Sequence, residues 1–518
     1  MANSFSVDKR KFWSGVIIVL PIIIALLYKT GPAPQTLAQS SQTSETVNQT
    51  SETSPPSELP PLNKRFTSIA ELEKQSNLPS RELNIQQWQT TNGARVYFMQ
   101  ADTLPMLDIR LVFAAGASRD DKLPGLAQIT NGLLAEGTSN KDAAQIAAGF
   151  EQLGAQFSNG SYRDMAIASL RTLTKENLLS PALDLFTEVI ATPSFPEDAF
   201  IRIKNQMMAN LQYIKQQPGK QASQAFYQAL YAKHPYGIPE HGTQTSLNTL
   251  TPDDIQNFYQ KYYVANNLVI ALVGGIDQTK AKAVAEQIAS KLPKGKAAPK
   301  TPTPTPIAKT QQKHIEFPSS QTHILLGTLG VARDAKDYPA LYIGNEILGG
   351  GGFGSRLMKE IREDRGLVYG VGSAFIPMQA AGPFFINLQT KQSQAKEALS
   401  LSQKILQDFI AEGPSQQELA QAKQKLLGRY PLSTASNADI VSQLGAIGFY
   451  HLPLDHMQQF LEDVQAVTRE DVQQAFAQHF QKQPLLTVTV GQQAKPDNTE
   501  KAQEKQPKHE APLTQASQ

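Results

Sequence analysis

The stretch GASRDDKLPGLAQITNGLLAEGT, from Gly116 to Thr138, decides how the rest of this chain is interpreted. Apolar residues recur at helical spacing from Leu126 to Ala135, and the Pro-Gly pair before them marks a turn. The run Leu107 to Ala114, which precedes this stretch, is typical of a β-strand. A strand, a glycine-containing turn and a helix are therefore expected here in succession.

The rest of the first half mixes strands and helices without regular alternation. This order favours an α+β architecture, with helices packed on a largely antiparallel sheet, over a doubly wound parallel sheet. The expected strands are Arg95 to Phe98 and Met165 to Leu170, and the expected helices are Ala143 to Leu153, Leu178 to Ala191 and Pro196 to Gln216.

Two segments in different halves of the chain share one pattern. The residues LTPDDI at 250–255 match VTREDV at 467–472, and an apolar, β-rich run follows each at the same distance. Thr251 and Thr468 would each cap a helix together with the aspartate three positions later, Asp254 or Asp471. Because the whole match keeps one offset, we infer two homologous repeats of one folding unit.

Polar and proline-rich segments divide the chain into six parts. We expect a signal peptide or membrane anchor at 1–30, a flexible polar tether at 31–84, a first folded domain at 85–293, a Pro/Lys linker at 294–312, a second folded domain at 313–492 and a disordered tail at 493–518.

Composition excludes several classes of function. The 518 residues include 48 Lys plus Arg and 46 Asp plus Glu, so the net charge of +2 provides no field that would attract nucleic acid. There is no cysteine, which excludes a disulfide framework, a thiolate zinc site and a cysteine nucleophile.

The N-terminus resembles an export signal. Lys9, Arg10 and Lys11 precede the uncharged run from Phe12 to Tyr28, and a polar spacer follows. A basic flank before a short apolar run is typical of a signal peptide or an uncleaved anchor. We expect a periplasmic protein, which is either freed by cleavage or tethered to the inner membrane.

The Gly116–Thr138 stretch resembles the opening of pitrilysin-like (M16) zinc peptidases. In that family a helix between Gly-Leu-Ala and Gly-Thr carries His-x-x-Glu-His, in which two histidines bind zinc and the glutamate activates water. Here the corresponding residues are Gln128, Asn131 and Gly132. Amides are poor zinc ligands and weak bases, and glycine has no side chain, so the motif is degenerate.

The resemblance places a third ligand, a glutamate, on a later helix near Met207 to Leu211. The segment Phe200 to Gln217 contains no acidic residue, and the eight histidines include no pair at helical ligand spacing. We therefore expect this chain to hold no metal or other cofactor. The zinc is expected in a partner subunit.

The second half contains GGGGFGSRL from Gly349 and then IREDRGLVY up to Tyr369. A nucleotide loop is disfavoured because no Gly-Lys-Ser/Thr follows, so the glycines are interpreted as a helix C-cap and an unusual turn after a helix at Tyr338 to Leu348. The same run resembles the C-terminal domain of M16 enzymes. That resemblance makes Arg365 and Tyr369 the catalytic and substrate-binding pair, with Gly351 and Gly352 contributing to substrate binding.

Together, the resemblance implies two repeats of the fold found in M16 and mitochondrial processing peptidases, over about Gln86 to Gly491. It also implies a role: a subunit without zinc that forms a heterodimer with a homologue carrying His-x-x-Glu-His. This subunit would contribute substrate binding and transition-state stabilisation to peptide hydrolysis. Two alternatives remain, which are a peptide-binding scaffold or chaperone-like protein and a homologue that has lost all activity.

Overall fold

The computed structural model describes residues 83–493. The N-terminal segment 1–30, nearly all of the tether 31–84 and the tail from 494 lie outside the described residues. Among residues 83–493, none of the helices combines the length and apolar character needed to cross a bilayer.

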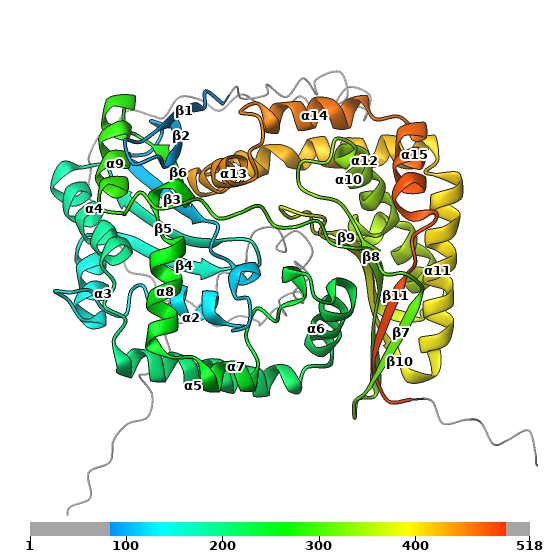
Figure 1. Ribbon diagram of the computed structural model, residues 1–518. Helices are drawn as coiled ribbons and strands as arrows, with labels where there is room; N and C mark the ends of the chain where they lie inside the picture. Colours follow the sequence, from blue (N-terminus) through cyan, green and yellow to red (C-terminus); the bar gives the residue numbers. More distant parts are fainter. Residues whose placement is uncertain (1–82, 494–518) are drawn as a thin grey trace, which may run out of the picture. The chain divides into compact units, whose positions relative to one another are not determined.

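The first half contains a six-stranded sheet in the order β1-β2-β6-β3-β5-β4 (Figure 1). Only β2 and β6 pair in parallel; the other neighbours are antiparallel. The strands are β1 (Gln86–Gln89), β2 (Arg95–Gln100), β3 (Met106–Phe113), β4 (Gln156–Ser161), β5 (Ala166–Leu173) and β6 (Leu268–Gly274).

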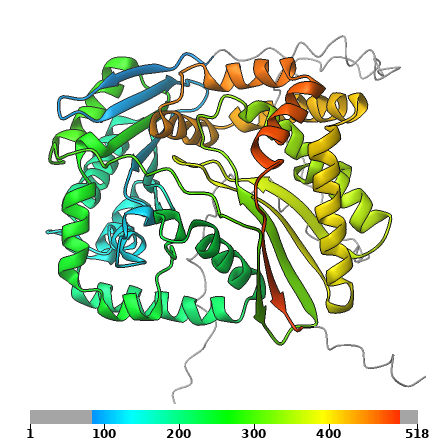
Figure 2. The ribbon, with the colours of Figure 1, turned by 45° about the vertical axis from the view of Figure 1, so that its right-hand side comes forward.

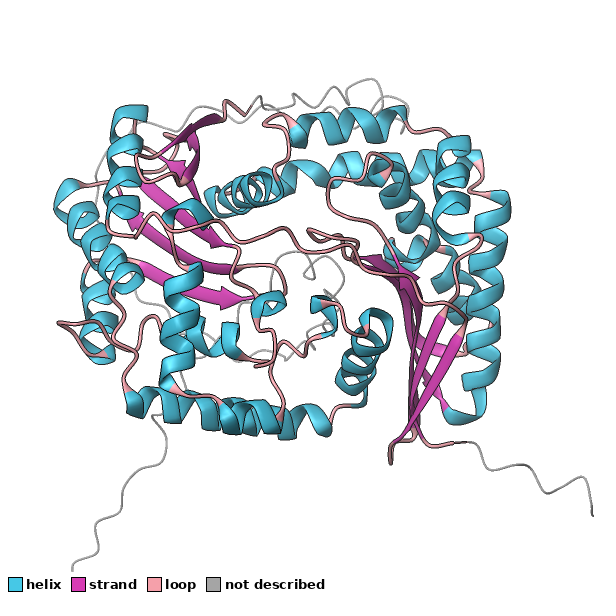
Figure 3. Ribbon diagram, in the orientation of Figure 1, coloured by secondary structure: helices cyan, strands magenta, loops and turns pink. Residues whose placement is uncertain are grey.

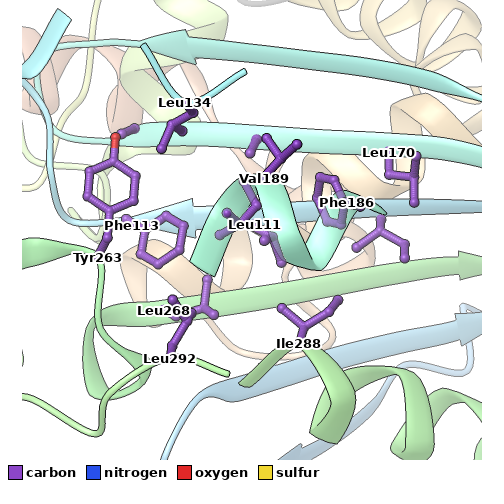
Figure 4. Close-up of a cluster of buried hydrophobic side chains, with 14 of the residues drawn as sticks. Leu111, Phe113, Leu134, Leu170, Phe186, Val189, Tyr263, Leu268, Ile288 and Leu292 are labelled. Atoms are coloured by element: carbon purple, nitrogen blue, oxygen red, sulfur yellow. The ribbon is translucent and has the colours of Figure 1, made fainter. Parts of the chain in front are cut away.

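Helices cover one face of this sheet and bury a continuous apolar core against it. Figure 4 shows part of that core, where Phe113, Phe186 and Tyr263 pack together with leucine, isoleucine and valine side chains. Burying each large apolar side chain stabilises the fold by about 1.5–3 kcal/mol. The helices of this half are α2 (Leu126–Gly132), α3 (Ala143–Gln152), α4 (Glu176–Ala191), α5 (Glu197–Lys215), α6 (Pro218–Tyr231), α7 (Gln244–Thr249), α8 (Pro252–Tyr262) and α9 (Gln278–Ser290), with short helical turns η1 (Ala117–Arg119), η2 (Pro235–Gly237) and η3 (Ala265–Asn267).

The second half contains a five-stranded sheet in the order β7-β11-β8-β10-β9. Figure 3 shows the strands in magenta and the helices beside them in cyan. Its strands are β7 (Gln311–Glu316), β8 (Gln321–Leu329), β9 (Val368–Phe375), β10 (Pro383–Lys391) and β11 (Leu486–Gly491). Its helices are α10 (Tyr338–Asn345), α11 (Ala395–Glu412), α12 (Gln416–Arg429), α13 (Asn437–Tyr450), α14 (His456–Ala466) and α15 (Arg469–Phe480), with the shorter segments η4 (Glu346–Gly350), η5 (Gly352–Gly354), η6 (Met358–Glu363), η7 (Gln392–Gln394) and η8 (Tyr430–Thr434).

The two halves are repeats of one unit, as the sequence predicts. The order β2-β6-β3-β5-β4 in the first sheet has the same topology as β7-β11-β8-β10-β9 in the second, including the single parallel pair. Thr251 and Thr468 each cap their helix in a capping box with Asp254 and Asp471. The α+β architecture and the antiparallel-rich sheets are therefore confirmed.

One helix of each repeat packs on the sheet of the other repeat. Helix α6 of the first half lies against β11 and β8, and α13 of the second half lies against β6 and β3 (Figures 1 and 2). Phe226 of α6 is fully buried with Val488 of β11, while Leu444 of α13 is fully buried with Val269 of β6. Each sheet thus has its own helices on one face and a borrowed helix on the other.

The segment that connects the halves has an extended backbone and is hydrogen-bonded to neighbouring parts of the fold. No helix or strand lies between Ser290 and Gln311, and β7 begins inside the expected linker range 294–312. Thr301 donates its backbone N–H and its hydroxyl to the Gln379 side-chain oxygen, and Arg119 donates to the Pro299 carbonyl. This segment is therefore held on both repeats by hydrogen bonds.

Candidate functional site

Helix α2 begins where a buried carboxylate caps its first turn. Both oxygens of Asp120 accept backbone N–H groups, from Gly125 and Ala127, at 2.7 Å each. Gly125 has φ +94°, a left-handed conformation that favours glycine. Burial raises the pKa of Asp120 well above its ordinary value, although the two N–H donors act in the opposite direction. The Pro-Gly turn predicted from the sequence therefore leads into a helix whose first turn is capped by the Asp120 carboxylate.

The degenerate motif residues of α2 bind other protein groups. Asn131 is 2% exposed, and its amide nitrogen donates to the Ile167 carbonyl at 3.2 Å and to the Tyr263 hydroxyl at 3.3 Å. The Gln128 side-chain oxygen accepts from His241 Nδ1 at 2.8 Å. A side chain at Gly132 would meet only Ile203, at 3.9 Å, so there is space but no ligand.

The position expected for a third ligand is apolar. Helix α5 buries Met207 and Leu211, and its Arg202 forms an ion pair with Glu136. Within residues 83–493, no group of three or more His, Cys, Asp or Glu side chains is arranged to hold a metal ion. The residues present therefore do not fit a zinc ion at this place.

Beside α2 lies the edge strand of the first sheet. Strand β4 pairs only with β5 among the described strands, and half of its six residues are exposed. Asn159 of β4 donates its side-chain amide to the Asn131 carbonyl at 2.6 Å. The degenerate motif and a strand with one unpaired edge are thus held in direct contact.

The glycine-rich run of the second half begins inside one π-helical segment, η4, at Gly349, and a second π-helical segment, η6, follows it. The expected helix at Tyr338 to Leu348 is α10 only up to Asn345, and the chain then continues as η4 through Gly350 instead of ending in a simple cap. Gly352 has φ +67° with no atom near its missing side chain, which fits the expected unusual turn. π-Segments are frequent at functional sites.

A buried carboxylate anchors this loop. The Glu346 side chain lies 3.1 Å from Lys425 and 3.1 Å from Arg429, and it is 8% exposed. The same Lys425 ammonium donates to the Gly351 carbonyl. The conformation at Gly351 is therefore tied to a charge cluster on α12 and η4.

Arg365 and Tyr369 are exposed at the start of β9. Tyr369 is 82% exposed, and Arg365 donates to the Glu360 carbonyl at 2.8 Å. Asp364 pairs with Lys359, so it does not neutralise Arg365. Within the described residues, no carboxylate forms an ion pair with Arg365 or a hydrogen bond with the Tyr369 hydroxyl.

Sequence reasoning missed the third member of this surface, Arg362. Its guanidinium lies 4.7 Å from the Phe353 ring and 5.6 Å from the Tyr369 ring, and Phe353 is itself 57% exposed. The alternation of polar residues in η6 carries no signal for such stacking. His241 was also missed as the partner of Gln128, because a residue so distant in sequence leaves no local pattern.

Arg356 has a different environment although it lies in the same sequence run. It forms two hydrogen bonds with Glu418, at 2.7 and 2.8 Å, and a third with the Gly413 carbonyl. Burial alone raises the pKa of Glu418, but hydrogen bonds from Arg356 and Ser415 outweigh it and lower that pKa to about 2. Arg356 therefore holds α12 in place.

The structure keeps the two candidate sites in separate repeats. The hydrogen bonds of Gln128 and Asn131 go to first-half residues, whereas those of Arg365 and Gly351 go to second-half residues. Figure 1 shows α2 and β9 on different sheets. Two repeats of a sheet covered by helices, one with a metal-binding helix that has lost its ligands, define a metallopeptidase homologue.

Comparison with known proteins agrees with this class. Residues 96–244 match the family described as Insulinase (Peptidase family M16), and residues 249–426 match Peptidase M16 inactive domain. A Helicobacter pylori protein named Non-peptidase homolog YmxG is 31% identical over 418 residues, which cover 79% of this chain and 94% of that protein. A Bacillus subtilis protein named Uncharacterized zinc protease YmxG is 25% identical, covering 70% and 87%.

Solved structures agree as well. The peptidase M16 inactive domain from Pseudomonas fluorescens is 48% identical, with a TM-score of 0.77 over 80% of this chain and 98% of that chain. A Helicobacter pylori protease, 18% identical, shares the fold with a TM-score of 0.72 over 79% and 99%. The chain belongs to the M16 peptidase family.

Proposed function

We propose that this chain is the non-hydrolytic subunit of a two-chain M16 peptidase, to which it contributes Arg365 and Tyr369. The observation that carries the proposal is the exposure of this pair. Tyr369 is 82% exposed on a strand, and no carboxylate within residues 83–493 neutralises Arg365. Phe353, which is 57% exposed, and Tyr369 flank the same Arg362 guanidinium, and an exposed cluster of aromatic and arginine side chains is typical of a surface that meets a partner.

The chemistry of the pair suits peptide hydrolysis. A guanidinium can bind the substrate carbonyl or a carboxylate, and a phenol hydroxyl can donate to the oxyanion that develops on the carbonyl oxygen. Arg362, stacked between Phe353 and Tyr369, limits the rotation of the phenol ring and adds positive charge beside it. The anchored loop at Gly351 and Gly352 would lie against the substrate backbone.

The first repeat would bind substrate without cutting it. An extended peptide can add to the unpaired edge of β4 through backbone hydrogen bonds, next to the α2 helix. Gln128 and Asn131 offer no base and no metal ligand there. We propose that this chain holds no zinc and that the partner, a homologue carrying His-x-x-Glu-His, supplies it.

Reconstitution tests the proposal. The chain is mixed with a zinc-bearing homologue, and turnover and complex formation are measured separately. Arg365→Ala and Tyr369→Phe should each reduce turnover on the order of 100- to 1000-fold, since removing one donor aimed at transition-state charge costs about 2.7–4 kcal/mol. Assembly should change little.

Lys396→Ala is the matched control, because Lys396 is an exposed cation on α11 of the same repeat and forms no ion pair within residues 83–493. It should keep nearly full turnover. Arg356 is a poor control because its loss would disturb α12. If both site variants keep full turnover in a normally assembled complex, the shared active site is refuted.

The free edge of β4 also favours a second candidate, a scaffold that binds extended peptides without a partner. Titrating fluorescent extended peptides into the isolated chain distinguishes the two. Tight binding by the isolated chain, together with no homologue in pull-downs, would favour the scaffold.

We also propose that the chain faces the periplasm, from the basic flank and apolar run before Tyr28. Alkaline phosphatase fused after Glu82 should be active. An inactive fusion, with a cytoplasmic reporter active at the same position, would reverse the topology.

A further inference from the structure

A cavity of about 900 Å³ opens beside the start of α2. Its walls come from the loop that precedes α2, from the turn between α6 and η2, and from α8. The lining side chains used below are Ser118, Arg119, Asp121, Lys122, Lys233 and Lys261, and we call this the basic cavity.

Four cations line the basic cavity without an ion-pair partner. Within residues 83–493, Arg119, Lys122, Lys233 and Lys261 have no carboxylate within 4.0 Å. Like charges gathered without partners repel one another, so their placement favours an anionic ligand.

The acidic groups at the cavity are mostly engaged elsewhere. Asp120 caps α2 with both oxygens, and Asp254 accepts from the backbone and hydroxyl of Thr251. Burial raises the pKa of Asp164, against the opposing charge of nearby Arg119, and the Asp164 oxygens accept from Tyr236 and Gln379. Outside the α2 cap, four cations of the lining therefore face two carboxylates, those of Asp121 and Asp254.

Two buried donors in the wall have no acceptor. Ser118 is 6% exposed, and its hydroxyl finds no hydrogen-bond partner among residues 83–493. The buried Nε of Arg119 likewise has none, while its Nη2 donates to the Pro299 carbonyl at 2.7 Å. Buried donors are normally paired, and both atoms here are shielded from solvent, so a small side-chain rotation would bring each to an anion in the cavity.

The backbone around the basic cavity is strained. Asp121 and Ala232 both have left-handed φ angles, +50° and +48°, which non-glycine residues rarely adopt. Both residues line the cavity. Strained backbone of this kind clusters at ligand sites, where the surrounding structure holds it in place.

The wall next to Ala232 is fixed by a neutral histidine. His234 Nδ1 accepts from the Tyr236 backbone N–H, so Nε2 carries the proton and donates to the Pro302 carbonyl at 2.7 Å. Burial lowers the pKa of His234. The positive charge of the basic cavity therefore comes from its lysine and arginine side chains.

We propose that the basic cavity binds an acidic peptide segment. The cations stand on three separate elements around a volume far larger than one small anion needs, so several negative charges in a row fit better than a single phosphate. The proposed site shares no residue with Arg365, Tyr369 or the edge of β4. It therefore stands or falls independently of the proposed peptidase role.

Fluorescence anisotropy with a labelled hexaglutamate peptide tests the site on the full 518-residue chain. The peptide should bind, and salt should weaken the binding. The double variant Lys233→Ala/Lys261→Ala should weaken it on the order of tenfold or more, and Ser118→Ala on the order of severalfold, since each loses a donor to a charged group. The double variant Lys291→Ala/Lys313→Ala makes the same change in net charge elsewhere on the surface and should bind as the parent does.

Thermal unfolding of each variant checks that the fold is intact. Three outcomes would overturn the proposal: no binding of hexaglutamate by the parent chain, equal weakening in both double variants, or inorganic phosphate competing as well as the peptide. Equal weakening would mean that net charge alone attracts the peptide. Effective competition by phosphate would mean that the cavity holds a single anion.

Discussion

Replacing Tyr236 by phenylalanine should weaken the attachment between the two repeats. The Tyr236 side chain is fully buried in the first repeat, and its hydroxyl donates to Asp164 at 2.7 Å while accepting the Ala380 backbone N–H of the second repeat at 3.0 Å. Asp164 in turn accepts from the Gln379 backbone N–H at 2.8 Å. One phenol therefore completes a buried network that spans both halves.

The expected loss is large. A hydrogen bond to a charged group contributes about 1.5–3 kcal/mol, and an unpaired buried N–H costs about 1–3 kcal/mol. Tyr236→Phe removes the hydrogen bond to the charged Asp164 and leaves the buried Ala380 backbone N–H without an acceptor. We expect the free energy of unfolding to fall by roughly 3–5 kcal/mol at neutral pH, measured by urea denaturation.

The loss should also depend on pH. Burial raises the pKa of Asp164, and the hydrogen bonds from Gln379 and Tyr236 lower it. Because the folded pKa lies above the unfolded one, stability from this group is complete below the ordinary pKa and is lost as pH rises through the raised pKa. Without the Tyr236 hydroxyl, the pKa of Asp164 rises further. The free energy of unfolding of the variant should therefore fall below that of the parent by more at pH 7.5 than at pH 4.

Tyr259→Phe is the matched control, because its hydroxyl donates only to the Ile190 carbonyl at 2.8 Å. It should cost about 1 kcal/mol and show no pH dependence. A loss below 1 kcal/mol for Tyr236→Phe, or one that is the same at both pH values, would refute the network as described.

Three further predictions concern the metal position, α12 and the borrowed helix. Restoring the motif with Gln128→His/Asn131→Glu/Gly132→His should still give no stoichiometric zinc by metal analysis, because Met207 and Leu211 occupy the place of the third ligand; one tightly bound zinc per chain would contradict this. Arg356→Ala should destabilise the fold above pH 4.5, and the difference from the parent in urea unfolding should shrink as pH falls toward 2, where Glu418 loses its charge; a difference unchanged by pH would count against the ion pair. Gly448→Ala on α13 should cost about 1–3 kcal/mol, because the new methyl group would lie 2.5 Å from Val269 and 2.6 Å from Tyr97, whereas Gly428→Ala on α12 meets nothing and should stabilise by about 0.4–1 kcal/mol; equal effects would refute the tight packing of α13.

Local patterns predicted much of the fold. The capping boxes at Thr251 and Thr468, the helix after the Pro-Gly turn and the apolar strands are all short-range features, and each is present. Strands β1 and β4 were not predicted because their residues, QQWQ and QFSNGS, are polar edge-strand sequences without apolar alternation.

The tertiary arrangement could not be predicted in the same way. The apolar face of α6 indicates that Phe226 is buried, but nothing in the pattern indicates that the sheet which buries it belongs to the other repeat. The candidate site shows the same limit. Tyr369 was identified by resemblance, whereas its stacking partner Arg362 and the loop anchor Glu346 depend on contacts between distant segments.

The exchange of α6 and α13 has a consequence during synthesis. When a ribosome has completed β6 at Gly274, the face of the first sheet that receives α13 is still bare, because α13 begins only at Asn437. At about 5–20 residues per second, that apolar surface waits on the order of ten to thirty seconds for its cover. We therefore expect a message truncated between the repeats to yield a product prone to aggregate, with one apolar face permanently exposed.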